Sequence, residues 1–79
     1  MKVGIVQTSN IEGKINEALH NAHDRGESSV TFIIQAHALP RVVSFLKDRE
    51  EISVLDIQDK SVFMVKHMRI TFEIVDYYV

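Results

Sequence analysis

The sequence predicts an α/β fold, an α+β sandwich that combines a four-stranded mixed sheet with two helices in the order βαβαββ. Three observations predict it. Residues 30–35 form a near-continuous apolar run of strand length, apolar residues recur at helical spacing before and after this run, and the last part of the chain alternates apolar and polar residues. The 79 residues are expected to form a single domain, residues 1–79.

The first strand is expected over residues 2–8, which begin with a mostly apolar stretch. A helix should follow, because apolar residues then recur on one helical face, at Ile11, Ile15, Ala18, Leu19 and Ala22. Ser9 and Glu12 match a capping box, in which Ser9 caps the helix and Glu12 bonds back to the Ser9 amide. Gly26 is predicted to end this helix.

The central run, residues 30–35, is apolar at both odd and even positions, which is typical of an interior strand covered on both faces. The second helix should begin near Pro40, because proline suits the first helical position. Its buried stripe is predicted from the spacing of Leu39, Val42, Val43 and Leu46. Both helices would be crossover connections, so the first three strands should run parallel, with right-handed connections.

The last two strands are expected to form an antiparallel hairpin. Residues 52–57 are predicted as the third strand, residues 58–61 as a polar turn, and residues 62–65 as a further apolar segment. From Met68 to Ile74 the apolar residues take alternate positions, but the parity is mixed before His67. A bulge or bend near residues 66–68 would reconcile the two halves.

The composition is that of a globular domain, because 46% of the residues are hydrophobic and 25% are charged. The chain has no cysteine, and no stretch approaches the roughly 18 apolar residues that suggest a transmembrane helix. We therefore expect a cytoplasmic protein without membrane contact. A domain this small buries a limited core, and a monomer would expose Phe45, Tyr77 and Tyr78, so a homodimer is expected.

The one local basic cluster consists of Lys66, His67 and Arg69. It could hold a nucleic-acid backbone while Phe63 stacks on a base, or it could be a charged hairpin that prevents edge pairing between sheets. The net charge of −2 argues against nucleic-acid binding unless the cations gather in space, because such domains normally show a basic excess.

Three residues at the predicted helix starts could hold an anion. His37 lies at a strand-to-helix junction, and Thr8 and Ser9 open the first helix. The simpler interpretations are a turn residue at His37 and a cap at Ser9.

Histidines on the first helix raise the question of a metal. His20 and His23, with Asp24 one turn after His20, could be ligands, but no third histidine completes the pattern. We expect no metal and no cofactor. The sequence also shows no glycine-rich phosphate loop, nucleophile set or paired carboxylates, so an enzyme is not expected.

The element order resembles the Alba family of chromatin and RNA-binding proteins, and the likeness extends to local sequence. Residues 11–19 have the apolar spacing of the family's first helix with its Ala-Leu pair, and Ile34-Gln35-Ala36-His37 stands where Alba proteins carry Ile-Lys-Ala-Arg. Residues 69–74 look like the family's closing strand. The resemblance implies an Alba-like fold, a homodimer, and non-specific binding of RNA or DNA.

This chain departs from the family at its phosphate contacts. The family's paired lysines fall at Thr8 and Ser9, and its later lysine and arginine fall at Gln35 and His37. The predicted nucleic-acid-binding residues are Thr8, Ser9, Lys14, His37, Arg41, Lys60, Lys66, His67 and Arg69. The alternative is a protein-interaction or regulatory module that keeps the fold and has lost the phosphate contacts.

Overall fold

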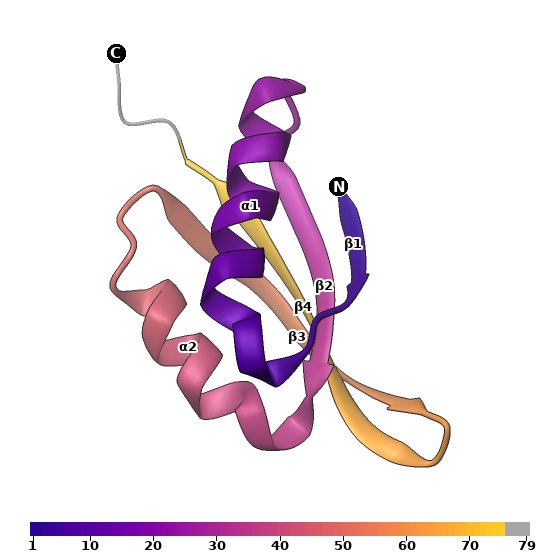
Figure 1. Ribbon diagram of the computed structural model, residues 1–79. Helices are drawn as coiled ribbons and strands as arrows, with labels where there is room; N and C mark the ends of the chain where they lie inside the picture. Colours follow the sequence, from indigo (N-terminus) through magenta and orange to yellow (C-terminus); the bar gives the residue numbers. More distant parts are fainter. Residues whose placement is uncertain (76–79) are drawn as a thin grey trace.

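The computed structural model describes residues 1–75 and confirms an α+β fold with a four-stranded mixed sheet and two helices (Figure 1). The strands are β1 (Lys2–Ile5), β2 (Ser29–Gln35), β3 (Ile52–Val62) and β4 (Val65–Ile74). The helices are α1 (Ile11–Asp24) and α2 (Leu39–Lys47), preceded by the 3-10 turns η1 (Thr8–Asn10) and η2 (Ala36–Ala38). Tyr77 and Tyr78, which we expected to be exposed, lie outside the described residues.

The sheet order is β1-β2-β4-β3, so the last strand lies between the second and the third. β1 and β2 pair in parallel, and β4 runs antiparallel to both β2 and β3. The first three strands therefore share one direction, as predicted, although β3 pairs with β4 and not with β2.

Both helices cover the same face of the sheet (Figure 1). On β2 the residues Val30, Phe32 and Ile34 are buried beneath them, whereas Ile33 is only partly buried on the open face. The prediction of a strand covered on both faces is therefore wrong. Ile33 interrupts an otherwise regular alternation, and its partner in the parallel pair is the exposed Ile5 of β1.

The core is the apolar layer between the two helices and this covered face. α1 contributes the predicted stripe, and α2 contributes Val42 and Leu46. The rings of Phe32 and Phe72 meet edge to face with their centroids 5.8 Å apart. Such a pair adds about 0.5–1.5 kcal/mol to the area that it buries.

The C-terminal end of α1 is as predicted. Gly26 has a φ of +69, which a residue without a Cβ adopts at little cost. Its amide donates to the His23 carbonyl, and the next amide, of Glu27, donates to the Ala22 carbonyl at 2.9 Å. These two bonds satisfy carbonyls that the helix end leaves open.

The predicted capping box at the other end of α1 is wrong. Asn10, not Ser9, precedes the helix, and it makes no side-chain cap hydrogen bond. The Glu12 carboxylate does not turn back to cap, because it pairs with the guanidinium of Arg41 on α2 at 2.8 Å. Gly13 is explained by the same turn, since a Cβ there would lie 2.6 Å from the Asn10 side-chain oxygen.

β3 and β4 form the predicted antiparallel hairpin, but its turn is displaced. The turn consists of Phe63 and Met64, and residues 58–61 belong to β3. β4 runs without a register shift through residues 66–68, so the predicted bulge there is wrong, and a register shift occurs instead in β3 after Val54. Polar residues 58–61 can form a strand because they are all exposed.

The end of the hairpin projects from the body of the protein (Figure 1). We call residues 58–69 the arm. β2 ends at Gln35, opposite His67, and beyond this pair β4 pairs only with β3. From Met68, which packs on the core, the strand runs about 13 Å to the turn at 3.3–3.4 Å per residue. The protein is accordingly elongated, with extents of 44 × 23 × 21 Å.

The turn at the end of the arm is strained. Phe63 has a φ of 50 and Met64 a φ of 63, the left-handed region that favours glycine and asparagine. Two-residue turns with both φ values positive are normally Asn-Gly. The backbone strain therefore falls on two residues with bulky side chains. This makes the turn less stable than an Asn-Gly turn would be.

Replacing Phe63 with Asn and Met64 with Gly should relieve this strain. We expect the free energy of unfolding of the double variant to rise by about 1–2 kcal/mol, measured by urea denaturation. A Phe63→Ala/Met64→Ala control removes the same side chains but keeps both Cβ atoms. An equal gain in that control would show that strain is not the cause.

Candidate nucleic-acid interface

Part of the predicted set gathers where β1 and β2 end. η1, with Thr8 and Ser9, follows β1, and η2, with His37, follows β2. The two strands are parallel and adjacent, so these turns lie at one edge of the sheet. Arg41 joins them, because its Nη1 donates to the Thr8 carbonyl at 3.3 Å. With Lys14 of α1, these five residues form the strand-end group.

The strand-end group offers little unmatched charge. The Arg41 guanidinium pairs with Glu12, and the Lys14 amine lies 3.6 Å from a carboxylate oxygen of Glu17. The Thr8 hydroxyl oxygen is buried, with no hydrogen-bond partner within residues 1–75. A phosphate here would have to compete with internal carboxylates for both cations.

The other predicted residues are on the arm. Cross-strand pairing sets Lys60 opposite His67, Ser61 opposite Lys66, and Gln58 opposite Arg69. Residues of β4 alternate between faces, so His67 and Arg69 share the face that the helices leave open. The Arg69 guanidinium donates to the Gln58 side-chain oxygen.

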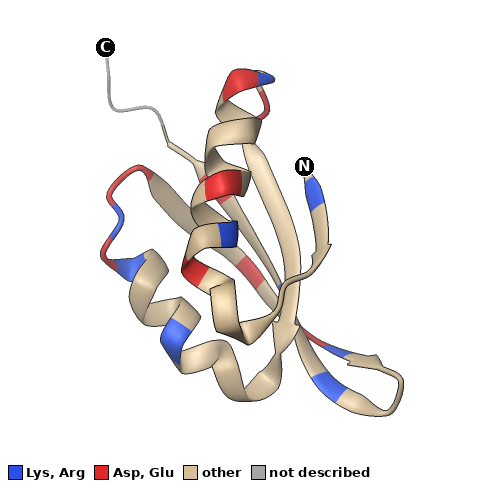
Figure 2. Ribbon diagram, viewed as in Figure 1, with Lys and Arg blue, Asp and Glu red and all other residues tan. Residues whose placement is uncertain are grey.

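The arm differs from the strand-end group because its cations have no carboxylate partners. Lys60, Lys66 and Arg69 form no ion pair in the described part of the chain. Residues 58–69 hold these three cations and one carboxylate, Asp59, which gives the arm a formal charge of +2. The whole chain has −2, so the remainder has −4. Figure 2 shows the basic positions on the projecting hairpin.

His67 has a different environment from the other arm residues. Its side chain is 7% exposed, and its Nδ1 lies 2.9 Å from the Val65 carbonyl oxygen. A donor Nδ1–H explains this contact and turns the ring toward its own strand. His67 therefore offers little surface to a ligand. It lies at the end of the pairing with β2, where the outer part of the arm begins.

Sequence reasoning named Phe63 as a possible base-stacking residue but missed that Phe63 and Met64 form an exposed turn at the tip of the arm. Phe63 is 94% exposed and Met64 is 100% exposed. The run of Val62, Phe63, Met64 and Val65 is visible in the sequence, but Phe-Met carries none of the glycine, asparagine or proline signals of a turn. Periodicity alone assigns such a run to a buried strand.

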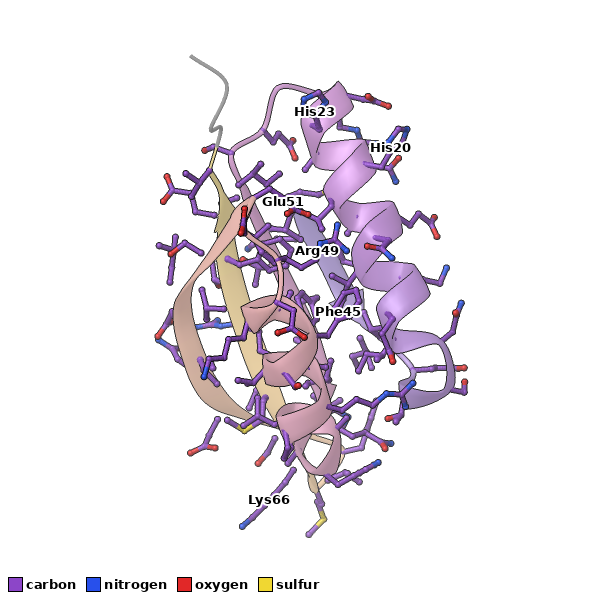
Figure 3. The ribbon with its side chains drawn as sticks, turned by 90° about the vertical axis from the view of Figure 1, so that its left-hand side faces the viewer. His20, His23, Phe45, Arg49, Glu51 and Lys66 are labelled. Atoms are coloured by element: carbon purple, nitrogen blue, oxygen red, sulfur yellow. The ribbon has the colours of Figure 1, made fainter. Side chains whose placement is uncertain are left out.

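A groove of about 950 Å³ lies at the opposite end of the protein from the tip. Its lining includes His20 and His23 of α1, together with Arg49 and Glu51 (Figure 3). Arg49 is held from three sides. It donates to Glu51 at 2.5 Å and to Asn16 at 2.7 Å, and its guanidinium lies 5.5 Å from the centroid of the Phe45 ring. These contacts tie α1, α2 and the start of β3 together.

Several charged groups in this groove have partners within the protein, although Glu50 forms no ion pair within residues 1–75. His20 lies 3.4 Å from Asp24, one turn further along α1. Residues 1–75 contain no group of three or more His, Asp or Glu side chains arranged to hold a metal ion. We therefore interpret the groove as a structural junction and place the candidate interface on the arm.

Glu51 makes the stability of this junction depend on pH. A backbone hydrogen bond of Glu51 and a side-chain hydrogen bond from Arg49 lower the pKa of the Glu51 carboxyl below its ordinary 4.5. A lowered folded-state pKa stabilises the protein above the unfolded-state pKa. This contribution is lost as the pH falls through the folded-state pKa.

Replacing Glu51 with Gln should therefore reduce the acid sensitivity of folding. Between pH 5 and pH 3, the melting temperature of the Glu51→Gln variant should fall less than that of the wild type. The control is Glu50→Gln, an exposed neighbour that forms no ion pair within the described residues. If the melting temperatures of the wild type and of Glu51→Gln fall equally with pH, Glu51 does not contribute to the acid sensitivity.

None of the described helices is long and apolar enough to cross a membrane. No protein-family model matches the chain, and comparisons with curated proteins and with solved structures give no match.

Proposed function

We propose that this protein binds nucleic acid, RNA or DNA, without sequence specificity and that the arm is its binding surface. The observation that carries the proposal is the separation of charge. The arm has a formal charge of +2 against −4 for the remainder of the chain, and its cations form no ion pair within residues 1–75. Its outer part, with Lys60 and Lys66, projects beyond the end of β2. The resemblance of the chain to Alba proteins supports the same class of ligand.

The contacts proposed are to phosphates and not to base edges. Lysine acts as a point charge toward phosphate, and within residues 1–75 neither Lys60 nor Lys66 has an ion-pair partner that would orient it. Arg69 keeps donors beyond the one that bonds Gln58. Such contacts attract any nucleic-acid backbone, so binding should depend strongly on salt.

The double variant Lys66→Ala/Arg69→Ala tests the surface. Each lost phosphate contact should lower the slope of log affinity against log salt by roughly 0.7–0.9. We expect weaker binding and a flatter slope, measured by fluorescence anisotropy with single-stranded RNA and duplex DNA. The free energy of unfolding should change by only about 1 kcal/mol, because Lys66 is exposed and the partly buried Arg69 loses one side-chain hydrogen bond.

The matched control is Arg25→Ala/Lys47→Ala, which removes the same charge from exposed positions outside the arm. An equal loss of affinity in the control would mean that only net charge matters. An unchanged slope in the arm variant would move the interface to the strand-end group. If the wild type binds neither nucleic acid, the proposal fails and the protein-interaction module becomes the better interpretation.

We further propose that two copies associate through β3. The outer edge of β3 has no strand partner within residues 1–75. Val54, Leu55 and Ile57 of this strand are 40%, 56% and 38% exposed. Apolar side chains along a free edge favour pairing with another chain, and the same surface is the observation that favours the interaction module.

Light scattering at micromolar concentration should therefore report a dimer, and Leu55→Glu should convert it to a monomer. The control is Ile5→Glu, on the strand at the other edge of the sheet, where the side chain is equally exposed at 53%. A wild-type monomer would rule out the dimer, and dissociation by the control alone would place the contact on β1.

A further inference from the structure

The tip of the arm is an apolar surface that nothing in the proposed phosphate contacts explains. Phe63 and Met64 are almost fully exposed, and Val65 beside them is 49% exposed. Both turn residues also hold a φ that bulky side chains rarely adopt. Exposure and backbone strain both make these two residues unfavourable in the free protein. Contact of their side chains with a ligand would account for their presence at the tip.

We propose that Phe63 and Met64 form a stacking tip for unpaired bases, so that the preferred ligand of the arm is single-stranded nucleic acid. This inference rests on the proposed function. The Phe63 ring presents a π face to one base, and Met64 covers the edge of the same base or of its neighbour. The cations behind the tip hold the phosphates that flank these bases.

The spacing of the cations favours a linear ligand. Lys66, Lys60 and Arg69 lie about 7, 10 and 17 Å behind the tip, at 3.3–3.4 Å per strand residue. Lys60 pairs with His67, so Lys60 and Arg69 share the open face, whereas Lys66 faces the other way. A nucleic-acid strand that runs along the open face can meet Lys60 and Arg69. A membrane would suit the apolar tip, but side chains that insert from one end reach only about 5–10 Å into it. Arg69 would then remain outside the contact.

The small size of the arm favours a single strand over a duplex. Bases of a duplex are already stacked, and a wedge must separate them at a cost of a few kcal/mol per step. Proteins that do so recover this cost by bending the duplex around a large surface. The arm offers only three cations to hold a bent duplex. A single strand already exposes base faces that the Phe63 ring can stack on.

The test compares variants of Phe63 against a single-stranded oligonucleotide of about 16 nucleotides and a duplex of the same sequence. Phe63→Ala should weaken single-strand binding by about fivefold to 150-fold, the effect of losing one base stack. The salt slope should stay as in the wild type, because no phosphate contact is lost. Duplex affinity should change little.

Two further variants separate stacking from simple apolar contact. Phe63→Trp should bind the single strand at least as well as the wild type. Phe63→Leu, which is apolar but has no ring, should be as weak as Phe63→Ala. The Phe63→Asn/Met64→Gly variant should also lose single-strand affinity while unfolding at higher urea, so that loss of binding cannot be attributed to loss of folding.

Phe63→Trp also gives a direct signal, because the chain has no other tryptophan. Single-stranded ligand should quench this tryptophan, whereas the control Phe45→Trp, against Arg49 and outside the arm, should keep its emission.

Equal losses of single-strand and duplex affinity in Phe63→Ala would overturn the inference, as would full binding by Phe63→Leu. Binding that depends on Lys66 and Arg69 but not on Phe63 would leave the proposed function intact and remove the stacking tip. A wild type that binds no nucleic acid would end both proposals. Phe63-dependent sedimentation with phosphatidylserine vesicles would then identify a lipid surface as the ligand of the tip.

Discussion

The register between β2 and β4 is the constraint on which the rest of the structure depends. These strands pair from Ser29 opposite Glu73 to Gln35 opposite His67. This register places Phe72 and Ile70 beside Val30 and Phe32 on the covered face, where both helices pack. A slip of one residue would turn Met68, Ile70, Phe72 and Ile74 to the open face.

The same register also decides where the arm begins. β2 cannot continue past Gln35, because the chain turns there into η2 and then α2. β4 extends further, so within the described part of the chain its outer end pairs with β3 alone and no helix covers it. Away from the core, selection for burial no longer acts, and the chain can carry lysine, serine and aspartate in strands. Because β3 and β4 are longer than β2, their outer parts form a surface whose chemistry is independent of the core.

Net charge is a poor guide to this protein because its charges are segregated. Salt screens interactions between exposed charges beyond about 8–10 Å. The outer part of the arm projects by about 13 Å from the core, so most of the acidic body lies beyond screening range of its end. Within the body, cations such as Arg41 and Arg49 are already paired with Glu12 and Glu51. A ligand at the outer part of the arm therefore meets Lys60, Lys66 and Asp59, a formal charge of +1, and not the total of −2.

Sequence reasoning succeeded where local patterns decide the structure. The stripe on α1, the stop at Gly26 and the βαβαββ order all follow from spacing and backbone preference. It failed where tertiary contacts decide. Glu12 does not cap α1 as predicted, because its carboxylate pairs with Arg41, a residue far away in the chain. Ile33 is a single apolar residue on the open face of β2, and it led to the wrong prediction that both faces are covered. The hairpin was predicted, but its turn was misplaced, because polar residues 58–61 have the composition of a turn and the true turn at Phe63 and Met64 has none of it.

The turn shows how a small domain can keep a costly feature. Strain at Phe63 and Met64 acts on the outer pairs of the hairpin, which can open locally while the core stays folded. The strain therefore lowers the population of the closed turn, and with it the free energy of unfolding, without disturbing the packing of the core. The buried contact of Phe32 with Phe72, which holds β2 and β4 together, lies far from this turn along the chain. Because the strained tip is separate from the packed core, the tip can keep side chains that suit a ligand even though they make the turn less stable.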